Sequence, residues 1–162
     1  MPDSHPELSA ALVEVFDHVH VVERWITPLA ESLVGADAAE AAWKPGPDER
    51  SLWDIVLHVA AWTEWVVAFL DGRDTEVTDW PPLGRTDPAA WEADRRRLDA
   101  ALAAFRERLA ALTPEALAEP PTPAVTPTTR LMGAMSILVH NAYHAGQVTK
   151  LRAEYARRRV SE

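Results

Sequence analysis

Cysteine is absent from this 162-residue chain, and lysine occurs only twice. The lack of cysteine excludes disulfides, thiolate metal ligands and a cysteine nucleophile on this chain. Any thiol that takes part in its chemistry must therefore come from another molecule. The absence of disulfides also agrees with a reducing compartment.

Positive charge is scarce as well. Sixteen lysines and arginines stand against 25 aspartates and glutamates, which gives a formal net charge of -9 and a pI near 5.1. Such a surface repels phosphate backbones, so we expect no nucleic-acid partner. Two runs of three arginines, at 95–97 and 157–159, are the only concentrated positive charge. Each run falls in an expected helix, where it is solvated or complements a helix end.

Long apolar runs are also missing. Nowhere do about 18 apolar residues follow one another, as a membrane-spanning helix requires. The N-terminal stretch MPDSHPELSA lacks the basic segment and apolar segment of a secretory signal. We therefore expect no membrane partner and a cytoplasmic protein. The length and the 48% hydrophobic content suit a single domain, residues 1–162, built around one core.

Two amphipathic helices are predicted in the first half of the chain, where apolar residues recur at spacings of three and four. The first begins at Ser4, whose spacing from Glu7 is that of a capping box, and continues to about Gly35. The second starts with Ser51 as its N-cap and ends at Asp71-Gly72. Both are long enough to be main helices of a bundle.

Two further helices are predicted in the second half. Asp87 followed by Pro88 marks the start of the third, and the fourth runs from about Thr129 to Arg158. Between them, residues 113–129 hold five of the thirteen prolines, which leaves room for a short helical turn at most. No segment has the alternating pattern of a strand. Four long amphipathic segments in one small domain predict an all-α four-helix bundle.

The link between the second and third helices is long enough for a crossover. Residues 72–86 can span about 50 Å when extended, more than the roughly 30 Å length of a 20-residue helix. The second and third helices can therefore run parallel to each other.

Two histidines lie four residues apart in the fourth helix, in the stretch ILVHNAYHAGQV at 137–148. His140 and His144 share a helix face, with Cβ atoms about 5–6 Å apart, and Gln147 joins that face. His58 keeps the spacing of the apolar stripe in the second helix, which points it inward. If these two helices are neighbours, three imidazoles converge as ligands of a divalent metal with an open position for water or substrate.

Other interpretations of the histidines stay open. A histidine such as His58 on an apolar face is commonly a core residue bonded to a carbonyl or carboxylate, and two histidines four apart also arise by chance. Asn141 stands where a protease of the HExxH type needs its glutamate, which excludes that class. His18 either faces inward and supports a metal ligand or is a partly exposed residue at a helix edge. His5 is expected to be exposed to solvent.

The stretches AWKPGPDERSLWDIVLHVAAWTEW (42–65) and LVHNAYHAGQVTKLR (138–152) together resemble the DinB-like superfamily of metal-binding four-helix bundles. That family shows a histidine in its second helix and a His-x-x-x-His-x-Gly-Gln pattern in its fourth. In this sequence these fall on His58, His140, His144, Gly146 and Gln147. The resemblance implies an up-down-down-up topology, a homodimer as in many members, and a divalent metal, often nickel or zinc, held by the three histidines.

Three functions are compatible with such a site. Some DinB-like relatives are S-transferases that join a low-molecular-weight thiol, such as bacillithiol, mycothiol or glutathione, to an electrophile, and the resemblance implies this activity on a small-molecule substrate. A metal-bound thiol is deprotonated, whereas a free thiol with a pKa of about 8.5 is mostly protonated at neutral pH. The same metal can instead activate water for hydrolysis. A protein that stores or senses a metal ion or small ligand is the non-enzymatic alternative.

Overall fold

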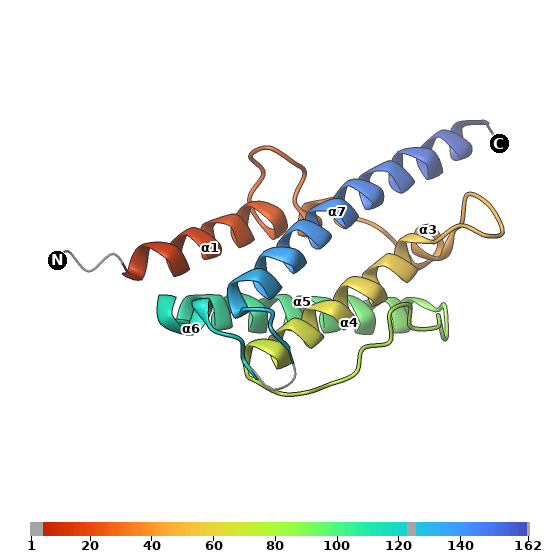
Figure 1. The fold of residues 1–162 in the computed structure, drawn as a ribbon. Coiled ribbons are helices and arrows are strands. Elements are labelled where there is room, and N and C mark those ends of the chain that lie inside the picture. The colour runs from red at the N-terminus through yellow and green to blue at the C-terminus, as the bar shows by residue number, and fades with distance from the viewer. Residues whose placement is uncertain (1–4, 123–125, 162) are drawn as a thin grey trace.

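The computed structural model describes residues 5–122 and 126–161 (Figure 1). Every regular element within these residues is a helix, which confirms the all-α class predicted from the sequence. The predicted N-cap Ser4 and the side chain of His5 lie outside this described part. The helices are α1 (His5–His20), α2 (Leu29–Ser32), α3 (Ala38–Ala42), α4 (Leu52–Leu70), α5 (Pro88–Ala111), α6 (Pro114–Ala118) and α7 (Arg130–Ser161).

The four long helices α1, α4, α5 and α7 pack around one core. α4 packs against α5 and α7, and α1 packs against the same two helices, so the four close a ring. In Figure 1, α1 and α7 run from left to right and α4 and α5 from right to left. Because α4 and α5 run the same way, the segment 71–87 between them returns along the length of the molecule.

Local sequence fixes both ends of α4 and the start of α5 as predicted. Ser51 Oγ accepts from the Asp54 N–H at 3.0 Å, and Asp54 Oδ2 accepts from the Ser51 N–H at 2.9 Å, which completes a capping box. Asp87 caps α5 by accepting from the Ala90 N–H at 3.0 Å. α4 stops just before Gly72, which adopts a φ of +74° that favours glycine.

The prediction of one continuous first helix, from Ser4 to about Gly35, is wrong. α1 ends at His20. The N–H groups of the next two residues both bond to the Asp17 carbonyl, at 2.8 and 2.7 Å. Further on, Pro28 disfavours a helical backbone at the residue before it, so α2 begins only after the proline.

The prediction was wrong because the spacing of apolar residues by three and four continues across this break. Phe16 before the break and Leu29 and Leu33 after it are almost fully buried and belong to the same core. The short helix α3 follows, capped by Asp37, and has no counterpart among the predicted helices. Segments that pack on one core keep a common spacing of apolar residues even when the helix between them is interrupted.

The proline-rich link before α7 holds the single short helix α6, as its composition predicts. Residues 123–125 of this link lie outside the described part. The Arg130 side chain at the start of α7 donates from Nε to the Leu70 carbonyl at 2.9 Å. This bond ties the start of α7 to the end of α4, the two helices that carry the histidines.

α4 is strongly apolar because it lies inside the core. Among the described residues it is the one helix long and apolar enough to cross a membrane by length and composition, yet 83% of that window is buried in the protein. Its Trp53 packs edge-on against Trp91 of α5, with ring centroids 5.1 Å apart. Burial against other helices thus accounts for its hydrophobicity.

Candidate metal centre

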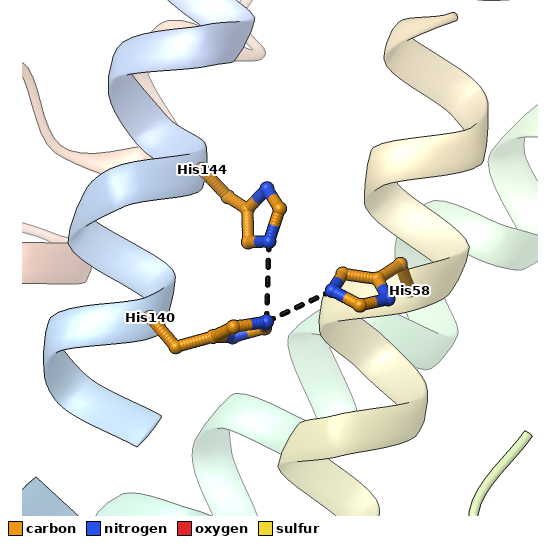
Figure 2. Close-up of side chains that lie close together, drawn as sticks. All are labelled: His58, His140 and His144. Atoms are coloured by element: carbon orange, nitrogen blue, oxygen red, sulfur yellow. Dashed lines mark hydrogen bonds between the residues drawn. The ribbon is translucent and has the colours of Figure 1, made fainter. Parts of the chain in front are cut away.

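Three histidines from two helices meet between α4 and α7, with their rings directed toward one another (Figure 2). His140 Nε2 lies 2.8 Å from His58 Nε2 and 3.1 Å from His144 Nε2. The possible ligand atoms of all three lie within 4.8 Å of one another. His140 and His144 share a face because they are one helical turn apart, and the packing of α4 on α7 brings His58 opposite them.

A backbone carbonyl fixes the tautomer of His58. Its Nδ1 is hydrogen-bonded to the carbonyl oxygen of Asp79, in the crossover between α4 and α5. A carbonyl oxygen only accepts, so Nδ1 carries the proton and the neutral ring presents a lone pair on Nε2. The Asp79 carboxylate lies 3.4 Å from the same Nδ1 and accepts from the Trp62 Nε1–H at 2.8 Å.

Amide oxygens hold the other two histidines in the same way. His140 Nδ1 lies 3.1 Å from Asn141 Oδ1, and His144 Nδ1 lies 2.7 Å from Gln147 Oε1. The Gln147 amide is itself oriented, because its Nε2 donates to the Tyr143 hydroxyl at 2.9 Å. The three histidines therefore bond their Nδ1 protons to oxygen and direct their Nε2 lone pairs at one point, as metal-binding histidines do.

Burial keeps the rings of His140 and His144 neutral. It lowers the pKa of His144 to about 4, and the neighbouring His140 adds to the effect. The pKa of His140 is also lowered, chiefly by burial. The neutral imidazole is the form that binds a metal, so both rings are in the ligand form at neutral pH.

The donor set fits a divalent metal ion held by His58, His140 and His144. Lone pairs on nitrogens 2.8 and 3.1 Å apart repel one another unless a cation or proton lies between them. Nitrogens bound to one tetrahedral zinc at about 2.0 Å stand about 3.3 Å apart, close to these separations. Three nitrogen ligands leave at least one coordination position for water or substrate.

Of the two residues predicted to support the ligands, the structure places Gln147 at the cluster and His18 away from it. His18 is only partly buried, and its Nε2 lies 3.3 Å from Arg24 Nη1. His20, also in α1, is linked to the cluster through Asn141: its Nε2 lies 3.1 Å from Asn141 Nδ2, and Asn141 Oδ1 lies 3.1 Å from His140 Nδ1. Sequence reasoning did not single out His20, because no spacing rule links a histidine of α1 to Asn141 of α7, and only the packing of these two helices brings them together.

The crossover after α4 contributes an aromatic wall that the helix-based prediction also missed. Trp80 stacks on His58, with ring centroids 3.9 Å apart and ring planes 10° apart. The Arg50 guanidinium lies 4.4 Å from the centre of the Trp80 ring. Trp62 of α4 is only partly buried and donates from its Nε1 to Asp79 Oδ1 at 2.8 Å. The available signal was a tryptophan followed directly by two prolines, which stiffen the chain after it.

Two cavities adjoin the cluster and share Trp80, Tyr143 and His144 in their walls. One has a volume of about 490 Å³, and its lining includes the three histidines together with Trp62, Trp80, Ile137 and Tyr143. The other has a volume of about 310 Å³, and its charged lining residues are Glu49, Arg50, Lys150 and Glu154. The histidine cluster is therefore bordered by an aromatic space and by a charged space.

Comparison with known proteins identifies a family. A family model described as the DinB superfamily matches residues 10–148, a span that contains the three histidines, Asn141 and Gln147. No curated protein and no solved structure matches the chain in the corresponding comparisons.

Proposed function

This chain belongs to the DinB superfamily, and from that premise and the histidine cluster we propose that it binds one divalent metal ion, zinc or nickel, through His58, His140 and His144. The observation that carries the proposal is the convergence of three Nε2 atoms whose rings are each held at Nδ1 by an oxygen. A bound divalent ion supplies Lewis-acid chemistry, which lowers the pKa of a coordinated thiol or water.

The proposed reaction is the transfer of a low-molecular-weight thiol to a small electrophile. The chain has no cysteine, so the thiol is a separate co-substrate. In the reaction the thiol gives up its proton, its sulfur forms a bond to the electrophilic carbon, and the leaving group departs with the electron pair of the broken bond. We place the protein in the cytoplasm, where thiols are kept reduced.

The two cavities support a reaction between two different molecules. The aromatic cavity, with Trp62 and Trp80 in its wall, suits an apolar electrophile. The charged cavity, with Arg50 and Lys150 beside two carboxylates, suits a thiol that carries both carboxylate and ammonium groups. Since His144 borders both spaces, reactants bound in them would meet beside the cluster.

Metal analysis tests the first part of the proposal. Untagged protein purified without chelators is expected to hold about one equivalent of divalent metal by plasma mass spectrometry, and His140→Ala is expected to hold almost none. His18→Ala is the matched control, because it removes a histidine of the described part that lies outside the cluster. Native protein that carries no metal and takes up neither zinc nor nickel on titration would overturn the ligand assignment.

Thiol turnover tests the second part. Metal-loaded protein is expected to conjugate glutathione, mycothiol or bacillithiol to monochlorobimane with release of chloride, and His58→Ala is expected to fall to the uncatalysed rate. Ester turnover that requires metal but no thiol would instead identify a hydrolase. Stoichiometric metal without turnover of thiols or esters would favour a metal-holding protein over an enzyme.

A further inference from the structure

His20 is a buried histidine outside the proposed ligand set. It is the last residue of α1 and is 1% exposed. Its Nδ1 lies 2.8 Å from the backbone carbonyl oxygen of Phe16. Because a carbonyl oxygen only accepts, Nδ1 carries the proton. Burial lowers the pKa of His20 to about 4, so the ring is neutral at pH 7 and its Nε2 is an acceptor.

Asn141 occupies the space between His20 and the cluster and is completely buried. Its Nδ2 lies 3.1 Å from His20 Nε2 and 3.4 Å from Thr63 Oγ1, so both amide hydrogens have acceptors. These contacts set the orientation of the amide and leave Oδ1 on the opposite side, 3.1 Å from His140 Nδ1. The hydrogen bonds thus form one chain from the Phe16 carbonyl to a proposed metal ligand.

We propose that His20 is a positioning residue for the metal centre: by accepting from Asn141, it holds the amide so that His140 keeps its proton on Nδ1 and its lone pair on Nε2. This inference rests on the proposed metal binding for its functional consequence. If the Asn141 side-chain amide flipped, exchanging the places of its oxygen and nitrogen, its Nδ2 would face His140 Nδ1. His140 would then carry its proton on Nε2, where the proton points at the other two histidines and blocks coordination.

The direct test is the tautomeric state of the histidines in metal-free protein, measured from ¹⁵N chemical shifts of the imidazole rings. In the native chain both His20 and His140 are expected to carry their proton on Nδ1. His20→Phe keeps a ring in the packed space but removes the acceptor, and is expected to move part or all of the His140 proton to Nε2. A native His20 protonated on Nε2 would overturn the proposal without any variant.

A rescue variant separates positioning from packing. An aspartate at position 141 has only acceptor oxygens, so one of them faces His140 Nδ1 whichever way the carboxylate is rotated. The double variant His20→Phe/Asn141→Asp is therefore expected to return the His140 proton to Nδ1. Zinc affinity, measured by competition with a chromophoric chelator, is expected to fall about 10- to 100-fold in His20→Phe and to recover in the double variant.

Failure of rescue, or native affinity and native tautomers in His20→Phe, would overturn the proposal. The matched control His18→Phe alters a histidine two residues away that does not contact Asn141, and should change neither measurement. If native protein binds no zinc or nickel, the proposed function fails, but the tautomer measurement on metal-free protein still decides whether His20 sets the state of His140.

Discussion

Zinc at a free concentration 1,000-fold above its dissociation constant is expected to raise the free energy of unfolding of the metal-free protein by about 4 kcal/mol. For a domain of this size that corresponds to a rise of about 10 °C in melting temperature. The reason is that the folded chain holds three Nε2 atoms within a few ångströms of one another, whereas the unfolded chain has no preformed site. Thermal unfolding followed by circular dichroism, in buffered zinc and in chelator, measures the difference.

Two variants serve as controls for this prediction. His144→Ala should lose the zinc response while costing the metal-free protein no more than about 1 kcal/mol, because removing one of three facing lone pairs relieves repulsion. Leu138→Ala, in the same helix and 1% exposed, should cost about 2–5 kcal/mol with or without zinc, yet keep the response. A zinc response that survived in His144→Ala would show that the stabilising ion binds elsewhere.

The histidine cluster could be predicted because helix periodicity constrains it strongly. A spacing of four places His140 and His144 on one face whatever the rest of the fold does. His58 lies in a helix whose N-cap and end are both set by local sequence, so its inward direction follows from the apolar stripe. The packing of α4 against α7 could not be predicted from the sequence, and the structure shows it.

The surroundings of the cluster could not be predicted, because they depend on tertiary contacts. Asp79 and Trp80 lie in the crossover, which has no period that would reveal which side chains face the bundle. His20 meets Asn141 through the packing of α1 against α7, and the continuing apolar spacing concealed the break that follows directly after His20. Residues 21 and 22 are valines and Pro28 follows shortly after, and these offered a weak local signal for that break.

The homodimer implied by the family resemblance stays a prediction. Several large apolar side chains are exposed on α7 and after α1, where a second copy would cover them, among them Trp25, Met132 and Val139. The mass of the protein in solution, measured by light scattering, distinguishes one copy from two.

Acid is expected to destabilise the metal-free protein by about 3 kcal/mol through His20 alone. In the unfolded chain this histidine titrates with a pKa of about 6.5, whereas in the folded protein burial lowers its pKa to about 4. Between these values the unfolded state binds more protons, so a fall in pH favours unfolding. The contribution of His20 to the free energy of unfolding is fully present above a pH of about 6.5, and it is lost progressively as the pH falls toward 4. Burial of His144 acts in the same direction.

Urea unfolding in the presence of chelator, at several pH values between 7.5 and 4.5, measures this dependence. His20→Phe should be less stable than native protein at pH 7.5, because Asn141 Nδ2 loses an acceptor, but its stability should fall less steeply with acid. His18→Ala should keep the native slope. Parallel slopes for native protein and His20→Phe would contradict a buried neutral His20. Protonation of His20 would set an N–H against the Asn141 amide hydrogens, so the acceptor state that orients Asn141 is the same state that makes the folded protein sensitive to acid.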